Sequence, residues 1–145
     1  MFKHILIPTD GATLSQAVIR DGVTFAKEIN AKVTAVHVGE PFHMLASNVE
    51  ALTDTREEYD WHVKRQAESI LAPFEKAAKE AGVSCDSSFL SSEHPYQAII
   101  DTAREKGCDL IMMASHGRRG VRGLLLGSET QKVLTHGKVP VLVYR

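Results

Sequence analysis

Residues suited to binding an anion gather in one stretch of the chain, from Ala114 to Thr130. Three arginines in it bring positive charge to a chain whose formal net charge is −1. Its glycines let backbone N–H groups approach a ligand without interference from a Cβ atom. The glycines are Gly117, Gly120, Gly123 and Gly127, and the arginines are Arg118, Arg119 and Arg122. This composition favours phosphate as a ligand, although a flexible glycine loop with solvated arginines fits it as well.

The end of this stretch has the pattern of a helix N-terminus. Ser128 and Gln131 have the spacing of a capping box, in which side chains satisfy the first free backbone amides of a helix. The spacing predicts that Gly127 and Ser128 begin a helix. The dipole and free N–H groups of that helix would attract negative charge.

Two further side chains could reach the same ligand. Asp10 follows the first apolar run and could accept a hydrogen bond from a base amino group or a ribose hydroxyl, or simply cap the next helix. His116 could contact a phosphate or a ribose, or hydrogen-bond its own turn.

The patterns of the common catalytic and metal centres are missing from the sequence. It has neither the Gly-x-Ser-x-Gly of a nucleophile elbow nor a P-loop ending in Gly-Lys-Ser or Gly-Lys-Thr. No two of the histidines stand at i and i+4, and Cys85 and Cys108 form no CxxC pair. We therefore assign no catalytic residue and no metal ligand.

Short apolar runs alternate with helical patterns, as in a parallel sheet covered by helices on both faces. We expect strands over 4–8, 32–38, 83–89, 110–115 and 139–144. Apolar residues that recur every three or four positions predict helices between them. Pro73 predicts a kink or break in the longest helix near residue 70.

The segments that follow the first, second and fourth strands should converge. In an open parallel sheet, ligands bind beyond the carboxyl ends of the strands, where the connections diverge to opposite faces. Residues 8–11, 38–39 and 114–117 lie there in the expected fold. This edge is the candidate site.

Length and composition fit one domain, residues 1–145, with 43% hydrophobic and 24% charged residues. A net charge near zero gives no general attraction to nucleic acid or to an anionic membrane. The longest apolar run, 110–114, is too short to cross a bilayer, and the N-terminus has no secretory signal pattern. We expect a soluble, cytoplasmic protein with no nucleic-acid or membrane partner.

The last predicted strand should lie at an edge of the sheet, because Pro140 cannot donate to a ladder. Its other residues are strongly apolar, and an exposed apolar edge invites aggregation. Either a second copy of the chain or a helix or loop of the same chain could cover it.

Over essentially its full length, the chain resembles the universal stress protein family. The resemblance rests on residues 5–10, the Val36-His37-Val38 strand end, the turn at 113–117 and the junction at 126–128 before residues 140–143. In nucleotide-binding members, a glycine is followed after two residues by a second glycine, then after nine by Gly-Ser or Gly-Thr.

Gly117 and Gly127-Ser128 match this spacing, and Ala114 replaces the first glycine. Alanine is costly at that position if φ is positive, and is tolerated at the end of a strand.

The resemblance implies a doubly wound, Rossmann-like α/β fold with five parallel strands in the order 3-2-1-4-5. It also implies a homodimer formed through the last strand, 139–144, and ATP or AMP in the crevice, where Mg²⁺ could accompany ATP. Asp10 and the Val38 backbone would hold adenine, residues 114–117 would lie near the ribose and phosphates, and residues 127–130 would contact phosphate. The full set of expected binding residues is Pro8, Thr9, Asp10, Val38, Ala114, Ser115, His116, Gly117, Arg118, Arg119, Gly127, Ser128, Glu129 and Thr130.

We expect a dimeric, nucleotide-binding sensor or regulator of the stress response. A fast catalyst is not expected, because no residue is assigned to orient an attacking water. One alternative is a slow ATP hydrolase or phosphotransferase that uses Asp10 or Glu129 as a ligand of metal or water. The other is a dimeric interaction protein that no longer binds nucleotide.

Overall fold

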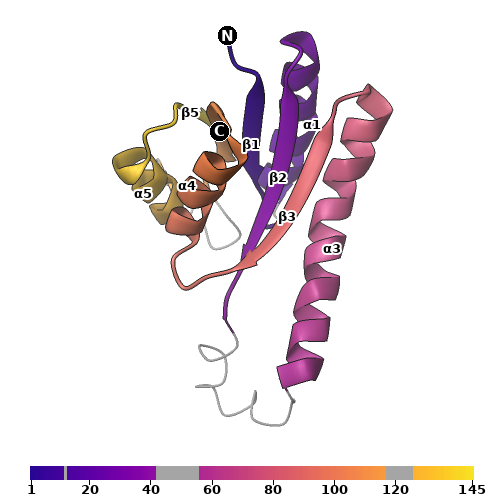
Figure 1. The fold of residues 1–145 in the computed structure, drawn as a ribbon, viewed down its shortest axis with the longest axis vertical. Coiled ribbons are helices and arrows are strands. Elements are labelled where there is room, and N and C mark those ends of the chain that lie inside the picture. The colour runs from indigo at the N-terminus through magenta and orange to yellow at the C-terminus, as the bar shows by residue number, and fades with distance from the viewer. Residues whose placement is uncertain (12, 42–55, 117–125) are drawn as a thin grey trace.

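The computed structural model describes residues 1–11, 13–41, 56–116 and 126–145. These residues form a five-stranded parallel sheet with helices on both faces (Figure 1). The strands are β1 (His4–Pro8), β2 (Lys32–Gly39), β3 (Cys85–Ser91), β4 (Leu110–Ala114) and β5 (Val141–Tyr144). The helices are α1 (Thr13–Glu28), α3 (Arg56–Ala81), α4 (Pro95–Lys106) and α5 (Ser128–His136).

The strand order is β3-β2-β1-β4-β5, and every pairing is parallel. The fold class and strand order expected for this chain are therefore confirmed. β1 lies at the centre, between β2 and β4. The chain adds β2 and β3 on one side of β1 and then adds β4 and β5 on the other side. Such a change of side opens a crevice at the carboxyl ends of the strands.

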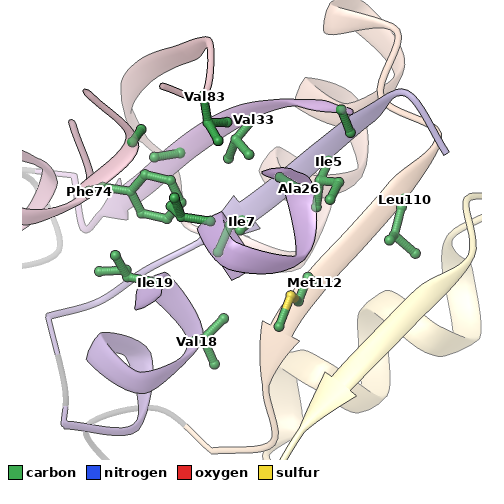
Figure 2. Packing of buried hydrophobic residues seen from close by; sticks show 14 of the residues in the cluster. Ile5, Ile7, Val18, Ile19, Ala26, Val33, Phe74, Val83, Leu110 and Met112 are labelled. Atoms are coloured by element: carbon green, nitrogen blue, oxygen red, sulfur yellow. The ribbon is translucent and has the colours of Figure 1, made fainter. Parts of the chain in front are cut away.

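Alternate residues of β1 enter two separate cores. Ile5 and Ile7 pack with α1 and α3, where Phe74 is completely buried (Figure 2). Leu6 faces the other way, into the cluster that α4 and α5 cover. The sequence of β1 is apolar at successive positions because helices cover both faces of the strand and exclude water from them.

The sequence predicted a kink or break near residue 70, and a break there is wrong, because α3 runs from Arg56 to Ala81 as one helix with Pro73 inside it. Proline costs a helix interior about 3 kcal/mol. Leu71, Phe74 and Ala78, on both sides of Pro73, are buried against the sheet. Their packing against the sheet stabilises the helix on both sides of Pro73. This packing offsets the helical hydrogen bond that proline cannot donate.

β5 is an edge strand as predicted, but it starts at Val141 rather than at 139. Pro140 stands just before it and contributes only an acceptor: its carbonyl oxygen receives the amide of Ile111 at 2.9 Å. The third strand also starts later than expected, at Cys85. In the described ranges, none of the helices combines the length and apolarity needed to cross a bilayer.

Asp109 and His4 fix the start of β1. The Asp109 carboxylate accepts the backbone amides of Lys3, at 2.9 and 3.1 Å, and of His4, at 3.0 Å. Burial raises the pKa of Asp109, but these amides outweigh it, so the pKa lies below its usual value.

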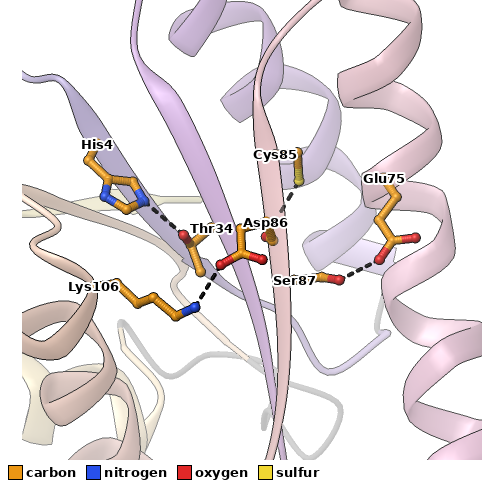
Figure 3. Close-up of polar contacts among 7 residues, drawn as sticks. All are labelled: His4, Thr34, Glu75, Cys85, Asp86, Ser87 and Lys106. Atoms are coloured by element: carbon orange, nitrogen blue, oxygen red, sulfur yellow. Dashed lines mark hydrogen bonds and ion pairs between the residues drawn. The ribbon is translucent and has the colours of Figure 1, made fainter.

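The His4 side chain is 6% exposed, and its Nε2 lies 2.7 Å from Thr34 Oγ1 (Figure 3). Its Nδ1 has no hydrogen-bond partner among the described residues. Burial lowers the pKa of His4, and the positive charge of Lys32 lowers it further.

We predict that His4 makes the fold sensitive to acid. The lowered pKa means that the folded state disfavours protonation of His4, while the unfolded chain takes up a proton there below about pH 6.5. The free energy of unfolding should therefore fall as the pH drops through that value toward the lowered folded pKa, by about 1.4 kcal/mol for each unit between the two. Urea unfolding at about pH 7.5 and about pH 5.5 measures this loss.

The variant His4→Gln should lose less stability between the two pH values than the wild type. His62→Gln is the matched control, because His62 is an exposed histidine. An equal loss in the wild type and in His4→Gln would contradict the prediction.

Candidate functional site

The candidate site lies at the carboxyl edge of the sheet. The Thr9 amide donates to Val36 O at 2.9 Å, and the Ser115 amide donates to Tyr144 O at 2.7 Å. β2 continues to Gly39, past the residue that pairs with Pro8, so Val38 borders the space beyond the end of β1. Gly117, Arg118 and Arg119 of the predicted site lie outside the described residues.

The first turn of α5 carries free backbone donors. Gly127 is the N-cap, and the first helical hydrogen bond runs from the Gln131 amide to Gly127 O at 3.0 Å. The amides of Ser128, Glu129 and Thr130 precede that bond and have no acceptor within the helix. No side chain among the described residues caps this helix. Its N-terminus is therefore suited to an anion.

The predicted capping box is wrong by one residue. Ser128 is already the first helical residue, whereas a capping side chain belongs to the residue before it and accepts the amide of the second or third helical residue. The Gln131 side chain instead donates from Nε2 to Leu126 O at 3.1 Å. The helix start itself, at Gly127-Ser128, was predicted correctly.

Two hydrogen bonds attach this turn to the end of β4. The Gly127 amide donates to Ser115 O at 2.6 Å, and the Thr130 hydroxyl donates to Ala114 O at 3.0 Å. Thr130 is 3% exposed. We call this pair of bonds the α5–β4 clamp.

Glycine at position 127 suits the clamp. A Cβ atom there would lie 3.1 Å from Ser115 O, so this carbonyl would have to move by a few tenths of an ångström to make room for any other residue. The backbone of Gly127 is extended, with φ −68°, so close approach rather than φ explains the glycine.

Ala114 carries no backbone strain. It is the last residue of β4, and Asn30 is the one non-glycine residue with a positive φ in the described part of the chain. An alanine therefore fits the position at which the family pattern has its first glycine. The next two residues interact with each other: the Ser115 hydroxyl lies 2.9 Å from His116 Nδ1.

Sequence reasoning gave His37 no separate role, yet its side chain helps to shape the site. His37 Nδ1 lies 2.8 Å from the backbone oxygen of Thr9, and its ring stacks on Phe89 with centroids 6.0 Å apart. This contact holds the turn that carries Asp10. The signal available in the sequence was the position of His37 at the end of the neighbouring strand.

The Glu129 side chain turns toward α4 rather than into the crevice. Its Oε2 accepts the Tyr96 amide at 2.8 Å, and its Oε1 pairs with Lys132 Nζ at 3.1 Å. Ser128, by contrast, is exposed. In the described ranges, no group of three His, Cys, Asp or Glu residues is placed to hold a metal ion.

A hollow of about 430 Å³ lies at the opposite edge of the sheet, where the strands begin. Lys3, Lys27 and Lys32 line it, beside the C-terminal ends of α1 and α3. Helix C-termini favour nearby cations, which accounts for these lysines without a ligand. None of the predicted site residues lines this hollow.

The sequence model of the universal stress protein family matches residues 1–145. The chain is 31% identical to the universal stress protein YxiE of Bacillus subtilis over 149 residues, which cover 100% of both proteins. It is 30% identical to a universal stress protein of Methanocaldococcus jannaschii over 145 residues, 100% of this chain and 83% of that protein.

Three solved structures share the fold. The hypothetical protein MJ0577 of Methanocaldococcus jannaschii has a TM-score of 0.83 at 24% identity, over 99% of this chain and 95% of that one. A universal stress protein in complex with cAMP gives 0.69 at 21% identity, over 99% and 97% of the two chains. One from Archaeoglobus fulgidus in complex with dAMP gives 0.70 at 17% identity, over 99% and 98%.

We predict that the Thr130 hydroxyl contributes measurably to stability. Thr130→Val keeps the shape of the side chain but leaves Ala114 O without its donor, which should cost about 1 to 2 kcal/mol of unfolding free energy. Thr135→Val is a matched control in the same helix, since the Thr135 hydroxyl also bonds a backbone oxygen, of Gln131, but is exposed. Urea unfolding should show a larger loss for Thr130→Val than for Thr135→Val, and a Thr130→Val variant that loses no more than the control would contradict the prediction.

Proposed function

Because the chain belongs to the universal stress protein family, we propose that it binds an adenine nucleotide, ATP or AMP, at the carboxyl edge of the sheet. The observation that carries the proposal is the first turn of α5, whose backbone donors are fixed beside the end of β4 and have no side-chain cap within the part of the chain that the structure describes. Amides at a helix N-terminus bind phosphate well. Two proteins of the same fold form complexes with cAMP and dAMP, which supports adenine nucleotide as the ligand class.

In this proposal the ends of β1 and β2 take the base. Asp10 accepts from the adenine amino group or a ribose hydroxyl, and the Val38 backbone borders the base. Pro8 and Thr9 shape the turn that His37 holds. The expected binding residues at the end of β4 are Ala114, Ser115 and His116, near the ribose and phosphates.

The phosphates lie against the start of α5. Ser128 offers a hydroxyl and an amide, while Glu129 and Thr130 offer amides, because the Thr130 hydroxyl already donates to Ala114 O. The Gly127 amide already donates to Ser115 O in the clamp, so it is not free for a phosphate. The contribution of Gly127 is that its lack of a side chain lets the ligand come close to the backbone. Gly117, Arg118 and Arg119 remain predictions from the sequence, as does Mg²⁺ bound with ATP.

The proposed role is that of a cytoplasmic sensor or regulator in the stress response. A slow ATP hydrolase would need Asp10 or Glu129 to hold a metal ion or an attacking water. The Glu129 carboxylate is engaged with α4 and Lys132, so no observation favours that alternative.

A negative charge at position 128 should weaken binding without harming the fold. Ser128→Asp places a carboxylate in the first turn, where it stabilises the helix but repels phosphate. Isothermal titration calorimetry should show ATP and AMP binding weakened on the order of tenfold or more. Ser128→Asn is the neutral control of the same size and should stay within about threefold of the wild type.

Two results would overturn the proposal. One is equal affinity of Ser128→Asp and the wild type for ATP. The other is a wild-type protein that binds neither ATP nor AMP. That result would favour the alternative of an interaction protein that does not bind nucleotide.

We further propose that two copies pair through residues 139–144. β5 hydrogen-bonds β4 on one side, and among the described residues no strand lies on its other side. Leu142 on this edge is 42% exposed. An apolar strand edge is protected when a second copy covers it.

Leu142→Lys should convert a dimer into a monomer, because a charged side chain blocks edge-to-edge pairing. Leu134→Lys is the matched control, since Leu134 on α5 is 43% exposed and lies outside the proposed interface. Sedimentation equilibrium measures the mass of each variant. A dimer that survives Leu142→Lys, or a monomeric wild type, would contradict the proposal.

A further inference from the structure

We propose that Glu129 is a positioning residue: its carboxylate caps α4 and thereby holds the first turn of α5 in the orientation that binds phosphate. The proposal rests on the proposed function. It concerns the Glu129 side chain, whereas the binding role assigned above uses only its backbone amide.

The N-terminus of α4 lacks a cap from its own segment. The N-cap residue His94 makes no side-chain cap hydrogen bond, and Pro95 has no N–H to satisfy. The amides of Gln97 and Ala98 both donate to His94 O, at 3.0 and 3.1 Å. The Tyr96 amide is left over, and Glu129 accepts it at 2.8 Å from 33 residues away.

The same contact makes a carboxylate tolerable beside a phosphate site. An unpaired negative charge at the start of α5 would repel phosphate. The negative charge of Glu129 is stabilised by the positive end of the α4 dipole and by Lys132, whose Nζ lies 3.1 Å from Glu129 Oε1. Lys132 also lies over the Tyr96 ring, 5.5 Å from its centroid, so α4 and α5 meet at Tyr96.

Glu129 supplies the attachment that the clamp lacks. The bonds of Gly127 and Thr130 both end on adjacent carbonyl groups of one strand end, those of Ser115 and Ala114. Val133 buries α5 in the core beside α4, but the two clamp bonds at its first turn end on one short segment and do not by themselves fix the direction of that turn. The bond from Glu129 ties the same turn to a second element, α4, and restrains that direction. Binding groups need such support, because small errors in their direction cost much affinity.

The variant series Glu129→Ala, Glu129→Asp and Glu129→Gln tests this role, with ATP and adenosine as ligands. Glu129→Ala should weaken ATP binding on the order of tenfold, as when residues that orient metal ligands are removed. Adenosine, which has no phosphate, should bind unchanged. Glu129→Gln keeps an oxygen for the Tyr96 amide and removes the charge, so it should bind ATP as tightly as the wild type or more tightly.

Glu129→Asp provides a second route if the alanine variant does not fold. Its carboxylate keeps the charge but is one methylene shorter, so ATP affinity should fall between those of Ala and the wild type. Glu105→Ala removes an exposed carboxylate near the other end of α4 and serves as the control, with no change expected.

A merely structural role would lower the melting temperature of Glu129→Ala and leave its ATP affinity unchanged below that temperature, which would overturn the proposal. Equal weakening of adenosine and ATP, or failure of Glu129→Gln to restore binding, would also overturn it. Failure of the wild type to bind ATP would identify the proposed function as the error and would remove this role with it. Hydrogen exchange at the Tyr96 amide reports the cap in the absence of nucleotide and should be faster in Glu129→Ala.

Discussion

The first turn of α5 must meet the end of β4 at close range, and the rest of the candidate site depends on that contact. Glycine at 127 permits it, since a Cβ atom would stand 3.1 Å from Ser115 O. The Gly127 and Thr130 bonds then join a helix start to a strand that the sheet holds on both sides, between β1 and β5. The free amides of α5 thus gain a fixed position beside the crevice, which no loop could give them as firmly.

The parallel sheet also separates the two kinds of helix end. α5 presents its N-terminus at the carboxyl edge, where it favours an anion. α1 and α3 present their C-termini at the opposite edge, where Lys3, Lys27 and Lys32 surround a hollow. The hollow and the proposed nucleotide site therefore lie at opposite edges of the sheet, beside helix ends of opposite polarity. Glu129 follows the same electrostatic rule, because its carboxylate lies at the positive N-terminal end of α4.

Local patterns in the sequence predicted the elements, and the family resemblance supplied the strand order. The start of α5 followed from Gly127-Ser128, but spacing alone could not tell whether Ser128 was the cap or the first helical residue. Pro73 predicted a break that packing of Phe74 overrides. The contacts of Glu129 with Tyr96 and of His37 with Thr9 join residues far apart in the chain. No local period encodes such pairs, so they emerge only when the fold brings the elements together.

The central claim is that the amides at the start of α5 meet the phosphate of an adenine nucleotide. Amide chemical shifts, recorded while AMP is added to isotope-labelled protein, test it most directly. The account predicts that the largest changes fall on Ser128, Glu129 and Thr130, with the amides of Lys27 and Gly82 at the opposite edge unmoved. Changes centred on that opposite edge, or a spectrum that AMP leaves unchanged, would contradict it.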